Sequence, residues 1–334
     1  MKGRKVFWVL YYPIVSLLLL EGALWLLGYR PYQHDAFQVS AQPSNWLEGD
    51  SLYGFGLGVG DFELAINEKL QFKSTHLESG RRYVGSQMEG DSLTKIDFYG
   101  CSYTYGYGLD DSLAMVWQIA TALPNAHLRS WAVPGYGTTQ AFLRLQAQLQ
   151  KRDTPTVAVI AYASFHAERN SLNAEYRRGL SLGFSENTNP QQLANFRYPY
   201  VDNQGNIQHQ AWLGLYAHWP GRSFSALINA VQSSTEFWLS DNRKKQERTE
   251  MVLAKIARLG QDAGIKMVFL PLTQDPATQE MQQKAKALGY EIIDAALDLT
   301  QTQFHNYPHD THPNAKAHTH YAEAFVDWYK QSNR

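Results

Sequence analysis

A serine in a glycine-rich stretch and an acid–base pair near the other end of the chain are the residues most suited to chemistry. Ser102 lies in Gly100–Gly106 (GCSYTYG), and Asp310 and His312 lie in the sequence PHDTHPN. A histidine can remove the proton of a serine hydroxyl, and a carboxylate can fix the tautomer of that histidine. Alone, each piece is weak, because glycine-rich turns and surface histidines are common. Together they predict nucleophilic catalysis at Ser102.

The neighbouring residues predict the elements that position these groups. Residues 96–99 form a short apolar run that ends at a glycine, which is typical of a buried strand followed by a turn into a helix. Residues 314–330 have helical spacing and begin just after His312. Chemistry in open α/β sheets gathers at the carboxyl ends of the strands. We therefore expect Ser102, Asp310 and His312 to meet at one edge of a sheet.

Strands and helices alternate between these two points. Apolar, β-branched runs predict strands at 127–133, 156–162, 266–270 and 290–293, and helical spacing predicts helices at 113–122, 138–150, 247–260 and 277–288. Five short strands interleaved with helices predict an α/β fold in which a parallel sheet is covered on both faces.

These motifs resemble those of the SGNH (GDSL-type) hydrolase superfamily. Gly100–Gly106 resembles the GDSxTxG block of that family, with Cys101 in place of the aspartate. Gly135, in the sequence VPGYGT, resembles the block that supplies an oxyanion-hole N–H. Asp310–Asn314 (DTHPN) resembles the block that carries the acid and the base, with one residue between them rather than the commoner two.

The resemblance implies a flavodoxin-like three-layer α/β/α fold with a central five-stranded parallel sheet. It implies ester or acyl chemistry that uses neither a metal nor a cofactor. It further implies that Ser102 is the nucleophile, His312 the base and Asp310 the acid that orients the base, with an oxyanion hole formed by the N–H groups of Ser102 and Gly135. The resemblance covers roughly residues 95–170 and 247–330.

The family's GxND block should follow the third strand, but residues 161–170 read AYASFHAERN and place no asparagine at the strand end. Ser164 and His166 can both donate a hydrogen bond from this loop. We expect His166 to be the third oxyanion donor, with Ser164 as the alternative, because an imidazole reaches farther than a hydroxyl. His166 could instead cap the loop or pair with Glu168.

The N-terminal residues 1–29 are expected to be a transmembrane anchor. The apolar run of residues 6–29 would reach roughly 36 Å as a helix, which is enough to cross a bilayer. Lys2, Arg4 and Lys5 precede it and favour a cytoplasmic N-terminus, with the catalytic domain outside the cytoplasm, in the periplasm or the extracellular space. A cleaved signal peptide and a buried helix are the alternatives; no good small-residue cleavage site is present.

The rest of the chain divides into two predicted parts. Residues 30–94 are polar and glycine-rich with short alternating pieces, which predicts a β-rich extension. Residues 95–334 form the SGNH-like α/β domain, with an aromatic-rich insertion at about 171–245. The insertion could be a lid or a sugar-stacking wall, or its aromatic residues could form a satellite core. Those aromatic residues are Phe196, Tyr198, Tyr200, Trp212, Tyr216 and Trp219.

Composition excludes several classes of function. Lys and Arg total 30 against 31 Asp and Glu, which argues against a basic nucleic-acid-binding protein. The single cysteine, Cys101, excludes an intrachain disulfide and any CxxC motif. Histidines crowd residues 305–320, but not at the helical spacing of HExxH, so we predict no metal site. Cys101 could itself be a nucleophile, but we expect it to be a small packed residue.

We therefore predict a membrane-anchored serine esterase that acts through an acyl-serine intermediate. The expected substrate is an ester-bearing small molecule or an acylated glycan of the cell envelope, and the expected membrane contact is residues 6–29. An O-acyltransferase that moves acetyl groups to a polysaccharide uses the same triad and stays open as an alternative. A catalytically lapsed, anchored binding or scaffold module is the other alternative, and no nucleic-acid partner is expected.

Overall fold

The structure, a computed structural model, describes residues 2–33, 39–85, 93–185, 193–239 and 242–332, with side chains for all of these except 2–7, 10, 185, 242 and 243. Parts of the predicted extension (34–38, 86–92) and of the predicted insertion (186–192, 240–241) therefore lie outside the described residues. The chain divides into two compact units. The smaller unit comprises Met1–Ala36 and Tyr216–Asp241, and the larger unit comprises Phe37–Leu215 and Asn242–Arg334.

Five parallel strands form one side of a nine-stranded sheet in the larger unit. Their spatial order is β8 (Ala126–Ser130), β7 (Thr94–Tyr99), β9 (Val157–Tyr162), β12 (Lys266–Pro271) and β13 (Glu291–Ile292). All four pairings between them are parallel. Among these five strands, β7 comes first in the chain and lies between β8 and β9, which come second and third. This is the order of flavodoxin-like sheets. The predicted parallel strands are confirmed, but across the described residues they belong to a larger, nine-stranded sheet with antiparallel strands.

The predicted β-rich extension continues this sheet and is not a separate part. Four strands extend the edge beyond β8, namely β6 (Arg81–Arg82), β5 (Leu70–Leu77), β4 (Gly60–Ile66) and β1 (Val39–Gln42). They pair antiparallel with one another, and Arg82 of β6 pairs with Ser130 of β8. An edge strand presents unpaired N–H and C=O groups, and the extension satisfies those of β8. The extension is β-rich, as expected, but its strands belong to the same sheet as the α/β domain and do not form a domain of their own.

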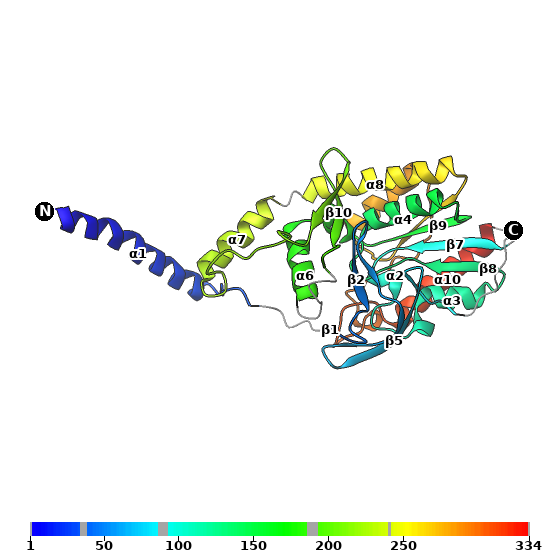
Figure 1. The fold of residues 1–334 in the computed structure, drawn as a ribbon, viewed down its shortest axis with the longest axis horizontal. Coiled ribbons are helices and arrows are strands. Elements are labelled where there is room, and N and C mark those ends of the chain that lie inside the picture. The colour runs from blue at the N-terminus through cyan, green and yellow to red at the C-terminus, as the bar shows by residue number, and fades with distance from the viewer. Residues whose placement is uncertain (1, 34–38, 86–92, 186–192, 240–241, 333–334) are drawn as a thin grey trace. The chain divides into compact units, whose positions relative to one another are not determined.

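Helices cover both faces of the sheet and make three layers (Figure 1). Two of them, α3 (Met115–Ala122) and α10 (Ala315–Ser332), pack on one face. The other face carries α4 (Thr138–Gln150), α8 (Asn242–Asp262) and α9 (Pro276–Ala287). Asp275 accepts a hydrogen bond from the N–H of Thr278 at 2.9 Å and so caps α9, with Pro276 in the first helical position.

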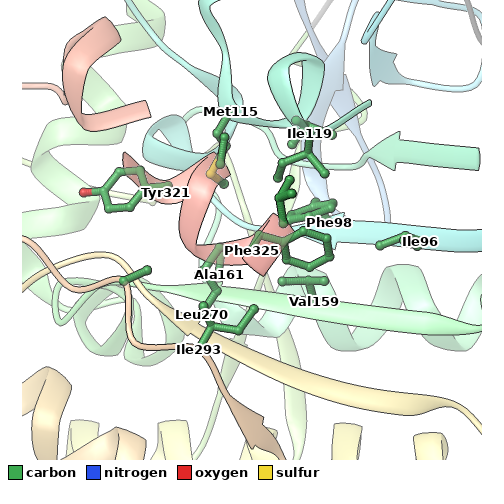
Figure 2. Packing of buried hydrophobic residues seen from close by; sticks show 14 of the residues in the cluster. Ile96, Phe98, Met115, Ile119, Val159, Ala161, Leu270, Ile293, Tyr321 and Phe325 are labelled. Atoms are coloured by element: carbon green, nitrogen blue, oxygen red, sulfur yellow. The ribbon is translucent and has the colours of Figure 1, made fainter. Parts of the chain in front are cut away.

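The first face buries a continuous apolar core, part of which Figure 2 shows. The rings of Phe98 in β7 and Phe325 in α10 lie 4.9 Å apart, centre to centre, and both side chains are fully buried. Met115 and Ile119 in α3 close the same layer. Burying a side chain of this size contributes roughly 1.5–3 kcal/mol, so this layer fixes the two helices that flank the ends of β7.

Shorter elements connect and decorate the layers. They are α2 (Ser102–Tyr105), η1 (Asp111–Leu113), α5 (His166–Ser171), α6 (Ala174–Ser185), η2 (Thr302–Phe304), and the antiparallel pairs β2 (Leu47–Asp50) with β3 (Gly54–Leu57) and β10 (Arg197–Val201) with β11 (Ile207–Ala211).

The aromatic residues of the predicted insertion divide between the two units. Phe196 and Tyr198 are completely buried and pack with Phe55 of β3, and Trp212 packs against the same cluster. These residues belong to a second hydrophobic cluster that the insertion shares with the β-rich extension, which agrees with the predicted satellite core. Tyr216 and Trp219 belong to the smaller unit, so the insertion is not one structural part.

The smaller unit is built on two helices, α1 (Lys2–Leu26) and α7 (Ala226–Leu239). The carboxylate of Glu21 in α1 accepts hydrogen bonds from Ser225 Oγ at 2.7 Å and from the N–H groups of Ala226 at 2.7 Å and Leu227 at 2.9 Å. Glu21 therefore caps α7, since the first N–H groups of a helix have no partner within it. The aromatic ring of Trp238 in α7 is 82% exposed.

The α1 helix covers most of residues 6–29, which the sequence predicts to be a membrane anchor. Across the described residues, none of the helices combines the length and the hydropathy that crossing a membrane requires. The side chains of Lys2, Arg4 and Lys5, on which the predicted orientation depends, lie outside the described residues.

Candidate active site

Ser102, His312 and Asp310 lie in one hydrogen-bonded chain at the carboxyl end of β7. The Nε2 atom of His312 is 3.0 Å from the Oγ atom of Ser102. The Nδ1 atom of the same ring is 2.6 Å from Oδ2 of Asp310. If Nδ1–H donates to the carboxylate, Nε2 carries the lone pair that accepts from the serine hydroxyl. The structure thus brings together the three residues that the sequence predicts to form the triad.

The carboxyl group of Asp310 is held in its charged form. Its side chain is only 3% exposed, and burial by itself would raise its pKa. Hydrogen bonds from the His312 imidazole and from the N–H of Thr311 outweigh burial and hold the pKa of Asp310 below its usual value. A permanently charged carboxylate can orient the imidazole and stabilise the imidazolium that forms when Ser102 loses its proton.

Two tyrosine rings flank the imidazole of His312. The ring centre of Tyr107 lies 4.8 Å and that of Tyr103 lies 5.5 Å from the His312 ring. Burial raises the pKa of Tyr103 to about 12 and that of Tyr107 well above its usual value, so both phenols are neutral at neutral pH. The two rings pack against the imidazole, whose side chain stays 21% exposed toward the cavity.

The turn that presents Ser102 depends on Gly100. This glycine ends β7, and α2 begins two residues later with Ser102. A Cβ atom at position 100 would lie 2.1 Å from Oγ1 of Thr104, which is far inside van der Waals contact. Only a glycine lets α2 approach the strand end this closely, and this approach brings the serine to the edge of the sheet.

The loop that follows Ser102 is held by the buried guanidinium of Arg82. Its Nη1 atom donates to the carbonyl oxygens of Tyr105 at 2.6 Å and Gly106 at 2.9 Å, and Nη2 donates to that of Leu109 at 2.6 Å. Its Nε atom forms an ion pair with Asp111 at 2.7 Å. Arg82 is only 1% exposed, so the β-rich extension supplies the charged group that fixes the nucleophile loop.

The second glycine-rich turn contains Gly135, the predicted oxyanion residue. The N–H of Tyr136 donates to the carbonyl of Val133 at 3.1 Å and closes the turn. Gly135 has φ = +89°, in the left-handed region, and a Cβ atom there would lie 2.9 Å from the Phe55 ring. Backbone conformation and space therefore both require glycine at this position.

Three side chains, Tyr176 and Tyr198 of the insertion and Arg169 just before it, hold the carbonyl groups of this turn. The hydroxyl of Tyr198 donates to the carbonyl of Gly135 at 3.2 Å, and the hydroxyl of Tyr176 donates to the same oxygen. Nη1 of Arg169 donates to the next carbonyl, that of Tyr136, at 2.8 Å. Because these carbonyls are held, the peptide planes that they share with the N–H groups of Tyr136 and Gly137, directly after Gly135, are fixed as well.

The two residues predicted as a third oxyanion donor do not lie at the site. His166 is 1% exposed, and its ring packs on Tyr162 and Phe165 between the layers. Burial lowers the pKa of His166 well below its usual value, and its Nε2 atom has no hydrogen-bond partner among the described residues. Neither His166 nor Ser164 is among the residues that line the cavity beside Ser102. We therefore correct this expectation.

Arg169, one turn farther along α5, is the side chain that sequence reasoning missed. It lies with Ser102, Gly135 and His312 among the residues that line the adjoining cavity. Helical spacing gives the signal that could have found it. His166, Ala167 and Asn170 form the buried face of α5, which leaves Arg169 on the other face. Asn170 is itself structural, since its Oδ1 atom accepts the N–H of Thr139 at the start of α4.

A cavity of about 330 Å³ adjoins Ser102 and His312 within the larger unit. The extension supplies Val39, Ser44, Trp46, Leu47 and Phe55; α6 supplies Tyr176, Gly179, Leu180, Leu182, Gly183 and Phe184; and the remaining lining residues are Ser102, Tyr107, Pro134, Gly135, Arg169 and His312. Its size lies within the usual range for small-molecule sites. Most of its walls are apolar, and they come from the parts of the chain that lie outside the five-stranded sheet.

Cys101 is fully buried and precedes α2, which agrees with its expected role as a packed residue. Within the described ranges, no group of three or more His, Cys, Asp or Glu side chains is placed to hold a metal ion.

The fold and the site together define an α/β protein with a Ser–His–Asp triad at the carboxyl edge of a parallel sheet. No protein-family model matches the chain, and no curated protein matches it. Among solved structures, the chain is similar to esterase EstA from Pseudoalteromonas sp., with 13% identity, 72% of this chain and 100% of that chain covered, and a TM-score of 0.41. It is also similar to a lipolytic protein of the G-D-S-L family from Veillonella parvula, with 10% identity, coverages of 71% and 98%, and a TM-score of 0.38. A carbohydrate esterase gives 13% identity, coverages of 73% and 67%, and a TM-score of 0.38.

Proposed function

We propose that this chain is a metal-independent serine esterase of the SGNH type. The observation that carries the proposal is the hydrogen-bonded chain from Ser102 Oγ through His312 to Asp310, at 3.0 Å and 2.6 Å, next to an apolar cavity. The complete geometry favours an active enzyme over a lapsed scaffold, because a chain without catalytic function has no need to keep a buried carboxylate on the imidazole.

The proposed reaction proceeds in two steps. As Ser102 Oγ attacks the ester carbonyl carbon, His312 Nε2 takes the hydroxyl proton and then gives it to the departing alcohol oxygen. The acyl group remains on Ser102 as an ester. A water molecule then attacks this ester, His312 accepts the proton of the water, and the acid leaves while Ser102 regains its hydroxyl. Asp310 stays ionised throughout and stabilises the imidazolium.

The oxyanion of each tetrahedral intermediate needs donors that are already in place. We assign this role to the backbone N–H groups of Ser102 and Gly135. The N–H of Ser102 belongs to the first turn of α2, where helix N–H groups have no intrahelical partner. Tyr176 and Tyr198 hold the carbonyl of Gly135 itself, directly beyond the Gly135 N–H in the turn. One such donor is typically worth about 10²–10³ in rate.

A fluorophosphonate probe tests the proposal directly, because it forms a covalent bond only with an activated serine. The wild-type chain should be labelled at Ser102, and Ser102→Ala should lose both the label and ester hydrolysis. Ser171→Ala, at the end of α5 and away from the cavity, is the matched control and should keep both. Full hydrolysis by Ser102→Ala would refute the assignment of the nucleophile. Adding a saccharide acceptor and analysing the products separates hydrolysis from acyl transfer, since both pass through the same acyl-serine.

We infer a cellular location from the sequence alone. Lys2, Arg4 and Lys5 before the apolar run of residues 6–29 favour residues 31–334 outside the cytoplasm, which would make acylated envelope glycans available as substrates. A reporter that is active only in the cytoplasm, fused after Arg334, should then be silent. Activity of that reporter would overturn the location while leaving the esterase proposal untouched.

A further inference from the structure

We propose that the acyl part of the substrate is an unbranched aliphatic chain of medium length, and that Gly179 and Gly183 of α6 leave the space it occupies. This inference rests on the proposed esterase function and adds the substrate class and the residues that set its length. It concerns a helix that lies outside the five-stranded sheet and its covering helices.

The chemistry of the cavity walls favours a hydrocarbon occupant. The cavity reaches Ser102 and His312, so an acyl group attached to the serine would extend into it. Leu47 and Phe55 form part of one wall, and Leu180 and Phe184 form part of another. Apolar walls gain free energy by covering apolar groups, whereas a sugar ring would need hydrogen-bond partners that these four side chains do not offer. Polar lining residues such as Ser44 and Tyr107 are present, but most of the wall is apolar.

Arg169 is the only Lys or Arg among the described lining residues, and its charge already has partners. Its Nη1 atom donates to the carbonyl of Tyr136 at 2.8 Å, and its guanidinium lies 4.3 Å from the ring centre of Phe165. A guanidinium engaged with a carbonyl and an aromatic face stabilises the turn that it contacts. We therefore assign Arg169 to positioning the Gly135 turn rather than to binding an anionic group of the substrate.

No contact within the described residues requires glycine at positions 179 and 183 of α6. Each glycine costs a helix interior about 1 kcal/mol relative to alanine. Neither Gly179 nor Gly183 lies in the left-handed region, and a Cβ atom built on either meets no described atom within 4 Å. Backbone conformation and packing therefore do not require glycine at these positions. Both residues are exposed and line the cavity one helical turn apart, so a side chain at either position would take up space beside a bound acyl chain.

The cavity volume sets the expected length of the chain. A cavity of 150 Å³ holds one benzene molecule, which has six carbon atoms. The 330 Å³ of this cavity is about twice that volume and corresponds to a chain of roughly 8–12 carbons. An acetyl group would leave most of the cavity empty. Until the cavity is filled, each added methylene should raise kcat/KM by up to roughly fourfold.

The test measures kcat/KM of the full chain for p-nitrophenyl esters from acetate to dodecanoate. For the wild type, kcat/KM should rise with chain length and peak near 8–10 carbons. Gly179→Leu and Gly183→Leu place a branched side chain in the cavity, so each should lower the ratio of kcat/KM for the decanoate to that for the acetate at least tenfold. The acetate value shows that these variants are folded and that the triad is intact.

Glu175→Leu adds the same side chain to α6 at an exposed position that does not line the cavity, and it should leave the whole profile unchanged. A wild-type profile without a rise from acetate to octanoate would overturn the inference, and so would glycine variants that slow all esters equally. In both cases Ser102-dependent acetate hydrolysis would leave the esterase proposal standing. Absence of all Ser102-dependent hydrolysis would instead refute the esterase proposal, and the inference with it.

Discussion

Replacing Arg82 by methionine tests whether the β-rich extension controls the nucleophile. The guanidinium of Arg82 is 1% exposed and contacts the loop after Ser102 at three carbonyl oxygens, besides its ion pair with Asp111. Methionine has a similar length and fills much of the same space, but it donates no hydrogen bond. The variant therefore removes the donors and leaves the packing nearly unchanged.

The expected cost follows from what the variant leaves behind. Asp111 is 14% exposed and becomes a nearly buried charge without its partner. Removing one member of a buried ion pair typically costs about 3–5 kcal/mol, and we expect the free energy of unfolding to fall by this amount. The loop also loses the donors that fix its carbonyls. A displacement of Ser102 of about 1 Å lowers the rate by roughly 10²-fold, so kcat should fall 10- to 100-fold even where the chain is folded.

Urea unfolding and ester hydrolysis of the full chain measure the two effects. Lys73→Met is the matched control, since Lys73 pairs with Glu63 on the surface, where its side chain is 76% exposed, and this variant should match the wild type. Arg82→Lys keeps the charge but loses the fork that reaches three carbonyls, so it should recover only part of the stability. A loss below about 1 kcal/mol in Arg82→Met, with unchanged kcat, would refute the reasoning.

Three further outcomes follow from the geometry. Gly135→Ala should lower kcat by roughly 10²-fold, because φ = +89° and the Phe55 ring both oppose a Cβ atom and shift the oxyanion turn; normal turnover of p-nitrophenyl acetate would contradict this. His166→Ala should lower the melting temperature and leave the rate of Ser102 acylation within threefold, whereas a tenfold slower acylation in stopped-flow measurements would return His166 to the site. Burial lowers the pKa of His76 to about 4. Between about pH 4 and 6.5, His76 is therefore protonated in the unfolded chain and neutral in the folded chain. Stability should fall as the pH falls through this window, by up to roughly 3 kcal/mol from His76, and His76→Gln should flatten that slope in urea titrations at successive pH values.

Much of the sheet and its helices could be predicted because local patterns determine them. Residues 138–150 were expected to be a helix, and α4 has these bounds, since an apolar stripe at helical spacing needs no distant partner to be recognised. Residues 156–162 were expected to be a strand, and β9 begins one residue later. The triad could be predicted because the topology of parallel sheets brings the carboxyl ends of strands together, whatever the distance along the chain.

The joining of the extension to the sheet could not be predicted in the same way. The link consists of β6, a strand of two residues, and its pairing of Arg82 with Ser130 of β8. Two residues carry no periodicity, and the free energy of the link comes from backbone groups of β8 that any strand could satisfy. The buried position of Arg82 is equally invisible in the sequence, because its partners are carbonyl oxygens and not a motif.

The error at His166 has a different physical origin. The prediction treated the residues after β9 as an open loop and compared how far each side chain could reach. The chain instead enters α5 at His166, and a helix sends successive side chains in different directions. His166 therefore turns inward to Tyr162, and Arg169 reaches the cavity. In an extended segment, the length of a side chain predicts what it contacts. In a helix such as α5, the position of the residue around the helix axis predicts it.

The residues that react and the residues that shape the cavity come from different parts of the chain. Ser102, His312 and Asp310 belong to the ends of elements in the five-stranded α/β core, where the topology fixes their positions. The walls of the cavity come from the extension and from α6, which are additions to that core. A change in these walls can alter which acyl group fits without moving the atoms that react, because the triad is held by separate contacts. For the same reason, Gly183→Leu is expected to lower kcat/KM for long acyl chains more than kcat/KM for acetate.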